Sequence, residues 1–510
     1  MKNIKTYLPI VLSLVIYSSG NAQRLSASDA EEHYKFGNYL DAYKLYSRFV
    51  LKRPTNAEYH YKAGLCLLFT NDDHSKAITY LEKALKLKAD PDVEFYLAKA
   101  YHSNLKLEKA LNAFENYKSD AKGTKLILVD KEIEYVKHSQ ELVANPIDLT
   151  FENLGSKINS EYPDYYPFVT PNESFMVFTS RRKNKIKEFD GYYPSAIYMS
   201  PVVNGEFVTS KKGSQSINSI YDNQAVGLSY NGDKLYIYFD DIKNTGDIYV
   251  SSGKNFKFKK KMKMGKAVNS KGFESSATIS ADGNTLFFAS KRDKGLGGKD
   301  IYMTRKLPTG KWAEPQNLGK NINTKYDEDF PNLFYDGTTL YFSSQGHNSM
   351  GGYDYFKSTW NPNTNEWSKA ENLGYPLNSP RDNLCISFTE DKRHAYVSTW
   401  RKDSKGFQDI YKVTFNELDK RETIIKAKIV TGVTNETIKN AFVIITNDKT
   451  QEKRNYTPNS LTGDIIITLP QGKYTILIDA PGYKFPVEKI TIAGKSDFIS
   501  MMSKKFIVTP

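Results

Sequence analysis

Short apolar runs that alternate with polar residues fill the middle of the chain and recur five times in the same order. Each unit opens with Ile-Asn-Ser or a close variant, whose asparagines are Asn159, Asn218, Asn269, Asn323 and Asn378. Thirteen residues later stands a turn residue, Asn or Asp, which glycine follows in three units. A second strand is then centred on Ile197, Ile248, Ile301, Tyr355 and Ile410, which recur at a nearly constant interval. This regular period, built from short strands and tight turns, predicts a β-propeller.

One unit of the repeat accounts for a four-stranded sheet. Its expected strands are 326–334, 340–344, 354–359 and 367–373. Such a sheet has two apolar faces, and radial packing against other sheets buries both. An outermost-type strand at 147–155 precedes the first unit, and the last unit ends after its third strand at 409–415. We therefore expect the early strand to complete the last sheet, which gives a five-bladed propeller over 146–418. A six-bladed ring is the alternative if a degenerate blade lies in 181–194.

Residues 23–145 instead place apolar side chains three and four positions apart, which predicts helices. Three alanines, Ala42, Ala77 and Ala110, recur at nearly equal intervals. Small residues precede them at Gly37, Gly64 and Ala98, where we expect paired helices to approach closely. This region resembles the tetratricopeptide repeat, which implies three helix pairs and a capping helix over 120–143.

Residues 422–500 return to alternating strands, expected at 424–430, 441–446, 464–469, 474–480 and 487–492. The segment LPQGKYTILIDAPGY, at 469–483, resembles the carboxypeptidase-regulatory-like domain. The resemblance implies a transthyretin-like β-sandwich. Residues 501–510 are expected to be a tail. The fold class is therefore a multidomain protein with one α and two all-β parts.

Residues 1–22 fit an export signal, with Lys2 and Lys5 before an apolar run and small residues before the expected cleavage site. No later run approaches the ~20 apolar residues of a membrane helix, so we expect no transmembrane span and a periplasmic location. The formal net charge is +13, but an exported protein is not expected to bind nucleic acid. Cys66 and Cys385 fall in different domains and are expected to be buried thiols.

The chemistry-bearing residues lack the spacing of known catalytic or metal sites. The seven histidines are scattered, and neither a His-x-x-x-His nor a Cys-x-x-Cys pair occurs. A Gly-x-Ser-x-Gly motif and a phosphate-binding glycine loop are also absent from the sequence. We therefore predict no metal, no cofactor and no enzymatic activity.

Two sets of residues are candidates for partner binding. Five residues after each repeat asparagine stand Asp164, Asn223, Glu274, Glu328 and Asn383, which would ring one mouth of the channel and could bind a cation or a basic segment. Alternatively, each caps its own turn or bonds a neighbouring blade, which its place in the repeat favours. In the helical array, Tyr34, Tyr59, Tyr61 and Tyr96 could line a groove for partner proteins, or they could pack between helices.

The order of helical repeats, propeller and regulatory-like sandwich resembles the PorE-like, OmpA-family envelope proteins of gliding, type IX-secreting bacteria. In that family the three modules precede a peptidoglycan-binding domain, which is not expected here. A cysteine for lipid attachment is not expected either. The resemblance implies a periplasmic, non-enzymatic scaffold associated with the outer membrane. It would bind outer-membrane or periplasmic proteins in type IX secretion, gliding motility or envelope assembly, and reach peptidoglycan only indirectly. The alternatives are a propeller-based hydrolase or lyase that acts on envelope glycans or peptides through Glu274 or Glu328, and a ligand-sensing propeller.

Overall fold

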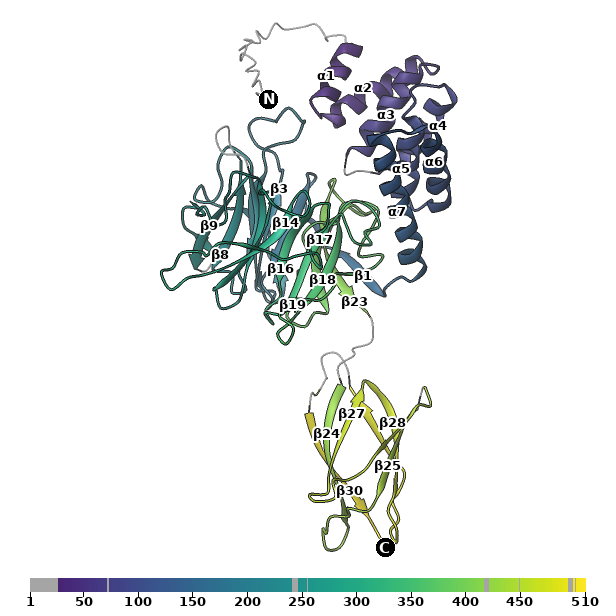
Figure 1. Cartoon of the computed structure of the whole chain (residues 1–510), viewed down its shortest axis with the longest axis vertical. Coiled ribbons are helices and arrows are strands. Elements are labelled where there is room, and N and C mark those ends of the chain that lie inside the picture. The colour runs from purple at the N-terminus through teal and green to yellow at the C-terminus, as the bar shows by residue number, and fades with distance from the viewer. Residues whose placement is uncertain are drawn as a thin grey trace. The chain divides into compact units, whose positions relative to one another are not determined.

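The computed structural model describes residues 26–510, apart from 71–72, 241–245, 255, 417–421, 449, 494–498 and 500. The export signal predicted for 1–22 lies outside these residues. The chain divides into two compact units, one ending at Phe415 and one beginning at Asn416 (Figure 1). The first unit contains the helices and a mostly β region, and the second contains strands alone among its described residues.

Seven helices form the predicted N-terminal helical region. They are α1 (Ala27–Lys35), α2 (Tyr39–Lys52), α3 (Ala57–Leu68), α4 (Ser75–Lys86), α5 (Val93–Ser103), α6 (Leu107–Asp120) and α7 (Thr124–Ala144). Each packs on the next along the chain. Local sequence sets where some begin: the side chains of Asn38 and Asn56 accept hydrogen bonds from the first turns of α2 and α3.

Small residues allow the helices to pair closely, as predicted, although Gly37 is not among them. Ala42, Ala77 and Ala110 are fully buried. A Cβ at Gly64 would lie 2.6 Å from Leu81 Cγ, so only glycine fits there. Gly37 instead ends the turn after α1 with φ +75° and has open space around it. Its expected role belongs to buried Ala30, because the interval from Ala30 to Gly64 equals that from Gly64 to Ala98.

The β region of the first unit consists of five antiparallel sheets. The first has β2 (Asp164–Val169), β3 (Phe175–Ser180), β4 (Ala196–Val203), β5 (Glu206–Phe207) and β6 (Lys211–Lys212). The second has β7 (Asn223–Leu228), β8 (Lys234–Phe239), β9 (Asp247–Lys254), β10 (Lys257–Phe258) and β11 (Met262–Lys263). The third has β12 (Glu274–Ile279), β13 (Thr285–Ser290), β14 (Asp300–Arg305) and β15 (Gln316–Asn317).

The fourth sheet has β16 (Glu328–Leu333), β17 (Thr339–Ser344), β18 (Asp354–Asn361), β19 (Glu366–Trp367) and β20 (Glu371–Asn372). The strand expected at 367–373 is therefore split into two short strands, both paired with β18. The fifth sheet has β21 (Ser387–Phe388), β22 (His394–Thr399) and β23 (Asp409–Phe415), together with β1 (Leu149–Asn153). Because β1 pairs with β23, the early strand completes the last sheet, as predicted. A short helix, α8 (Gly155–Ile158), follows β1.

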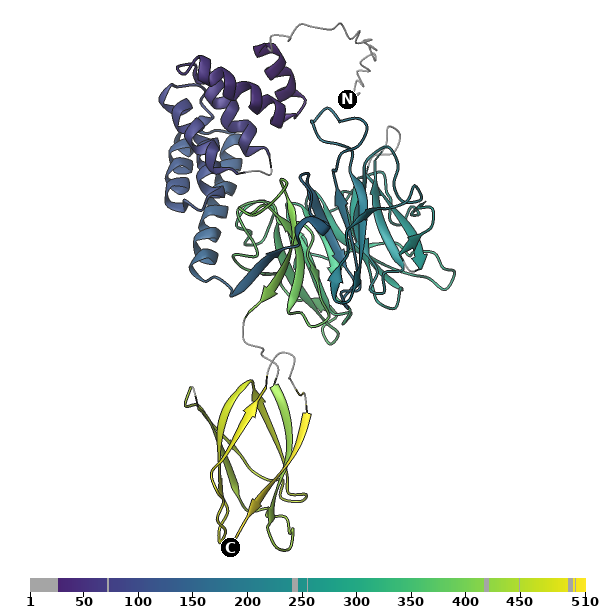
Figure 2. The same cartoon turned by 180° about the vertical axis from the view of Figure 1, so that it is seen from behind.

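The five sheets close into a propeller-like ring (Figures 1 and 2). Inner strand β2 contacts β7, β7 contacts β12, and β12 contacts β16. The side chain of Asn332 in β16 donates to the Ile386 carbonyl at 2.8 Å, and β21 and β22 return to β2. Residues 181–194, where a degenerate sixth blade was the alternative, contain no strand.

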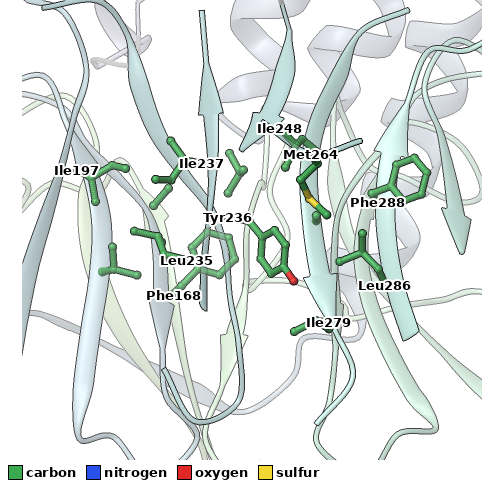
Figure 3. Packing of buried hydrophobic residues seen from close by; sticks show 14 of the residues in the cluster. Phe168, Ile197, Leu235, Tyr236, Ile237, Ile248, Met264, Ile279, Leu286 and Phe288 are labelled. Carbon is green, nitrogen blue, oxygen red and sulfur yellow. The ribbon is translucent and has the colours of Figure 1, made fainter. Parts of the chain in front are cut away.

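Successive side chains of each strand point to opposite faces of its sheet, and each face is buried against a neighbouring sheet. In β8, Leu235 and Ile237 point toward Phe168 and Ile197 of the first sheet (Figure 3). Tyr236, between them, points to the other side, where the third sheet supplies Ile279 and Leu286. This two-sided burial is the packing that the alternating sequence predicts.

The second unit consists of two sheets around one apolar core. The strands are β24 (Glu422–Thr431), β25 (Phe442–Asn447), β26 (Lys453–Tyr456), β27 (Asp464–Pro470), β28 (Gly472–Asp479), β29 (Glu488–Ile492) and β30 (Met501–Val508). The sheets run β27-β24-β30 and β26-β25-β28-β29, and both contribute to the core. The prediction of a tail at 501–510 was wrong, because β30 pairs in parallel with β24 and buries Phe506 and Val508. Strand β26 was not predicted.

Candidate functional site

The repeated asparagine holds neighbouring sheets together. In each unit its side chain accepts from the backbone N–H and donates to the backbone C=O of one residue in the third strand of the preceding sheet. The pairs are Asn159–Ile410, Asn218–Ile197, Asn269–Ile248, Asn323–Ile301 and Asn378–Tyr355. All ten bonds measure 2.7 to 3.0 Å. These five contacts, called the asparagine clasps below, explain why the asparagine recurs.

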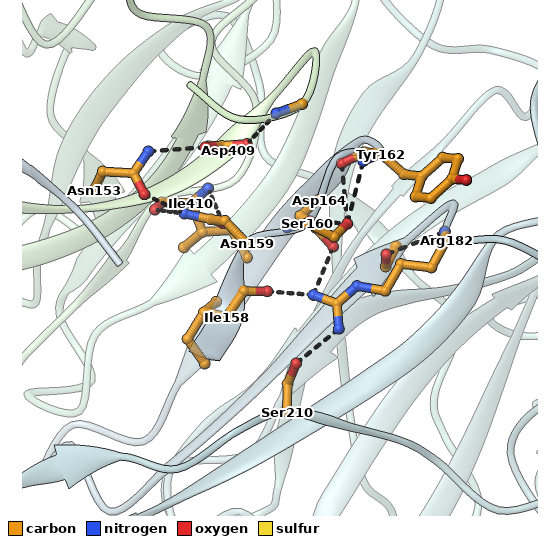
Figure 4. A network of polar contacts seen from close by, with 12 residues as sticks. Asn153, Ile158, Asn159, Ser160, Tyr162, Asp164, Arg182, Ser210, Asp409 and Ile410 are labelled. Carbon is orange, nitrogen blue, oxygen red and sulfur yellow. Dashed lines mark hydrogen bonds and ion pairs between the residues drawn. The ribbon is translucent and has the colours of Figure 1, made fainter. Parts of the chain in front are cut away.

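The five candidate channel-mouth residues lie at or just before the start of each innermost strand, as predicted. Their side chains are nevertheless at most 2% exposed, and each is used by its own turn. Asp164 accepts from the backbone and hydroxyl of Ser160 at 2.6 and 2.7 Å, and Arg182 lies 3.2 Å away (Figure 4). The same figure shows the clasp from Asn159 to Ile410 beside it.

Glu274 and Glu328 repeat this arrangement with an additional hydroxyl. Glu274 accepts from the backbone and hydroxyl of Ser270 and, at 2.7 Å, from Ser290. Glu328 accepts from the backbone and hydroxyl of Thr324 and, also at 2.7 Å, from Ser344. Burial raises the pKa of Glu328 to about 7, because the charged form is costly away from water.

The two asparagines of the set are also engaged. Asn383 accepts from the Ser379 backbone at 2.8 Å, and Asn223 donates to the Ser219 hydroxyl at 2.9 Å. None of the five side chains therefore offers a free oxygen to a cation or a basic segment. The geometry matches the alternative that each caps its own turn.

The axis of the ring is closed below these caps. Tyr166 in the first sheet and Phe330 in the fourth sheet have ring centroids 4.4 Å apart, although their sheets are not neighbours in the ring. Both residues have positive φ, 54° and 47°, at places where the register of the inner strand shifts. This backbone distortion turns the two side chains toward each other. A substrate path through the centre is therefore blocked at this level.

The mouth of the ring, above the contact of Tyr166 with Phe330, is polar, and its charged side chains pair with one another. Asp329 forms an ion pair with Lys299 and accepts from the Ser275 and Ser276 hydroxyls at 2.7 and 2.6 Å. Arg181 and Arg182 are consecutive basic residues, and each is held by neighbours; Arg182 donates to the Ser210 hydroxyl at 2.9 Å. Arg181 binds Glu188 at 2.5 Å and Asp190 at 2.8 Å.

Helix α7 fastens the helical array to the loop between β17 and β18. Tyr135 OH donates to the Gln345 carbonyl at 2.8 Å, His138 Nδ1 lies 3.0 Å from the Ser349 carbonyl, and Ser139 Oγ donates to the Met350 carbonyl at 2.8 Å. His102 of α5 adds a bond to Ser139 at 2.8 Å. Ser139, Met350 and Ser349 are fully buried, so this attachment excludes water.

Three of the four candidate tyrosines, Tyr34, Tyr61 and Tyr96, belong to one apolar cluster of the array. Tyr61 is 7% exposed and packs under Tyr96, with ring centroids 6.2 Å apart. Tyr59 packs on Phe49 between α2 and α3. Tyr34 lies under the Lys62 ammonium, 3.9 Å from its ring centre. Burial raises the pKa of Tyr34 and Tyr61, as expected for packed phenols. Of the four, Tyr96 belongs to the surface feature described next, and Tyr34 contacts it through Tyr39, with ring centroids 5.6 Å apart.

Aromatic rings line the array from the end of α1 to the start of α5 in two touching groups. One group comprises Tyr39, Phe69 and Tyr96, and the other comprises Phe36 and, from the loop after β3, Phe189. The centroid distances are 5.0 Å for Tyr39–Phe69, 5.9 Å for Phe69–Tyr96 and 5.6 Å for Phe36–Phe189. Phe36 is 55% exposed, Phe69 41% and Phe189 82%. We call this set the aromatic strip.

Sequence reasoning missed most of the strip, although a signal was present. Phe36 and Phe69 stand at the same place, the residue that caps the C-terminus of the first helix in two successive pairs. The third pair has Asn104 there. Two exposed phenylalanines at one repeat position indicate a surface that the helical packing does not require.

The described residues hold neither a cluster of three potential metal ligands nor a helix long and apolar enough to cross a membrane. Cys66 and Cys385 are free and buried, as predicted, and burial raises the pKa of both thiols. Neither thiol is therefore primed as a nucleophile.

Comparison with known proteins gives only distant likenesses. No protein-family profile and no curated protein matches the chain. Among solved structures, TolB from Acinetobacter baumannii matches with a TM-score of 0.33 and 15% identity over 56% of this chain and 70% of that one. A glycoside hydrolase matches with a TM-score of 0.39 and 8% identity over 55% and 95%. An endo-arabinase from Bacteroides thetaiotaomicron matches with 0.32 and 15% over 50% and 94%. At these scores the likenesses decide nothing about activity.

Proposed function

We propose that this protein is a periplasmic, non-enzymatic scaffold that holds outer-membrane or periplasmic proteins on its aromatic strip. The observation that carries this proposal is the exposure of Phe36 and Phe189, which stack on each other, and of Phe69, which contacts Tyr39 and Tyr96, without a covering segment among the described residues. Exposed aromatic clusters are typical anchors for partner proteins, because they bury a large apolar area with little loss of side-chain entropy. The attachment through α7 would keep the strip in a fixed place beside the polar mouth.

The modular order extends the proposal. We interpret the five sheets as the blades of a five-bladed propeller, the helices as tetratricopeptide-type repeats and the second unit as a transthyretin-like sandwich. This order supports membership of the PorE-like group of OmpA-family envelope proteins and, with it, a role at the outer membrane in type IX secretion, gliding motility or envelope assembly. Peptidoglycan would be reached through partners.

The hydrolase alternative requires acids that can reach a substrate. Glu274 and Glu328 are fully buried, bonded within their own turns and separated from the far side by the contact of Tyr166 with Phe330. A general acid must lie within hydrogen-bond reach of the reacting atom. The geometry therefore favours the scaffold over an enzyme that works in the channel.

Affinity purification from cross-linked envelopes of the producing cells tests the proposal. The Phe36→Ala/Phe69→Ala protein should recover the membrane-complex subunits of the wild type several-fold less well. Phe442→Ala is the matched control, because Phe442 has the same 55% exposure as Phe36 but lies in the second unit. Equal recovery by both variants, with both folded, would contradict a partner site on the strip.

A further inference from the structure

A groove crosses the outside of the ring between the third and fourth sheets. Three adjoining hollows of about 340, 120 and 320 Å³ form it, and Met303 lines all three. The groove exists because the third sheet is reduced here. Its third strand, β14, has six residues where β4, β9 and β18 have eight. The short paired strand that follows in those sheets is replaced by a single bridge between Lys306 and Trp312.

The floor of the groove is aromatic. Trp360 of β18 and Trp367 of β19 are paired across the hairpin, with ring centroids 5.4 Å apart. Trp367 is 7% exposed and meets Phe287 of the third sheet edge-on at 5.9 Å, whereas Trp360 is only half-buried. Trp367 is thus part of the packing, and Trp360 presents indole surface to the groove.

The repeat itself does not require Trp360. The equivalent residues, which pair in the same register, are Val202 in the first sheet and Gly253 in the second. Between the first two sheets the same space is filled, because Phe256 stacks on Phe175 at 3.9 Å. The counterpart of Phe175 in the third sheet is Thr285, whose smaller side chain leaves the hollow open. The large indole of Trp360 and the small side chain of Thr285 therefore lie at the same place in the groove.

The rim of the groove is polar and carries both signs of charge. The side chains of Gln316, Asn365 and Glu366 are exposed and form no hydrogen bond to other described residues. Arg305 and Lys320 line the same groove with positive charge, and Glu314 and Glu366 line it with negative charge, so the two signs balance. Asn321 donates to the Trp367 carbonyl at 2.7 Å and so holds the hairpin in position.

We propose that this groove binds a carbohydrate chain. An indole face offers apolar surface to the C–H face of a pyranose ring, and its flat shape suits a flat ring. Free amide and carboxylate groups at the rim match hydroxyl groups, which both donate and accept. The balanced charge selects a neutral glycan over a strongly anionic or cationic one. A protein partner would need a broader apolar patch than this bounded hollow provides.

Fluorescence titration of the mature protein tests the site. The probes are the neutral oligosaccharides cellotetraose, chitotetraose, mannotetraose and maltotetraose, each raised to about 10 mM, where a millimolar site would be saturated. Saturable quenching by at least one of them is expected, because Trp360 would be covered. Trp360→Val, which introduces the residue that the first sheet already uses, removes the reporting indole, so its binding is compared with that of the wild type by isothermal titration calorimetry and should be at least about tenfold weaker.

Two further variants keep the test decisive. Gln316→Ala/Asn365→Ala removes rim groups that serve no contact within the described chain, so it should weaken binding without lowering the melting temperature. Trp400→Phe removes an indole outside the groove and should leave binding unchanged. The proposal is overturned if none of the four sugars binds, if Trp360→Val binds as well as the wild type, or if a proline-rich peptide binds the groove and no sugar does.

Discussion

Asn159 and Ile410 lie far apart in the sequence and are joined by two hydrogen bonds, of 2.8 Å from the Ile410 N–H and 2.9 Å to the Ile410 C=O. The same clasp joins every other pair of neighbouring sheets, but only this one links the beginning of the β region to its end. Together with the pairing of β1 and β23, it closes the ring. The asparagine thus recurs in every unit because it joins neighbouring sheets. We therefore look for binding sites on surfaces that do not follow the repeat.

Removal of the closing clasp should destabilise the first unit. Asn159→Ala leaves the buried N–H of Ile410 without its side-chain partner and leaves the Ile410 C=O with the Leu154 N–H as donor, which should lower the free energy of unfolding by about 1–3 kcal/mol. Urea denaturation followed by circular dichroism measures this value. Asn363→Ala, at an exposed turn, is the control and should have almost no effect. Hydrogen exchange should also accelerate in β1 and β23, and unchanged protection there would contradict the closing role.

Gly64 should not tolerate a methyl group. Gly64→Ala places a Cβ 2.6 Å from Leu81 Cγ, and we expect a loss of about 1–3 kcal/mol from overpacking between α3 and α4. A double-mutant cycle in the full chain isolates this contact. The same change made in a Leu81→Ala background should cost clearly less, because the space is then free. Equal costs in both backgrounds would show that the two residues do not compete for space.

The last strand should be essential to the second unit. Phe506 is fully buried in the core and Ile507, its neighbour, is 55% exposed. Phe506→Ala should therefore lower the stability of this unit by about 3–5 kcal/mol. Ile507→Ala should change it little and serves as the matched control. Limited proteolysis of the full chain measures the stability of the second unit, as the rate at which that unit is cleaved. Similar resistance in both variants would mean that β30 is dispensable.

The attachment of α7 should weaken in acid. The pKa of His102 is lowered from 6.5 to about 4, mainly because burial disfavours the charged imidazolium; Glu132 acts against this shift and Lys99 acts with it. Between these values the unfolded chain binds a proton that the folded chain does not, so the free energy of unfolding falls as the pH drops from 6.5 toward 4.

The variant His102→Gln can still donate a hydrogen bond toward Ser139 but cannot titrate. Its stability should fall less between pH 7.5 and 4.5 than that of the wild type, by roughly 2–3 kcal/mol. His74, whose pKa burial also lowers to about 4, remains in both proteins, so the difference isolates His102. Identical pH dependence of the urea midpoint would rule out a neutral, buried His102.

How much of the fold could be predicted from the sequence depends on how far apart in the chain the contacting residues are. The nearly constant period of the repeat and the unpaired strand at 147–155 were sufficient to predict that β1 completes the last sheet. The partner of each asparagine was not predictable, because it lies on the preceding sheet, out of reach of any local pattern. Strand β30 was missed because its partner β24 stands at the opposite end of the second unit's sequence.

The sequence could not choose between the two interpretations of the candidate channel-mouth residues for a related physical reason. Acids at one repeat position are equally consistent with a ring around a mouth and with five separate caps, and only the hydroxyl contacts of Ser160, Ser270 and Thr324 distinguish the two. The aromatic strip was missed because the helical spacing of apolar residues does not tell which of them are buried, such as Tyr61, and which are exposed, such as Phe69.

The central claim is that the repeated acids stabilise the fold and that partners bind elsewhere. Its most direct test measures the melting temperature and the recovery of envelope partners for Glu274→Ala/Glu328→Ala in parallel. We predict a melting temperature lower by several degrees, because four hydroxyl groups lose their acceptors, with partner recovery unchanged in cells grown below that temperature. Loss of partner recovery, or of an activity on envelope glycans, at an unchanged melting temperature would contradict the claim.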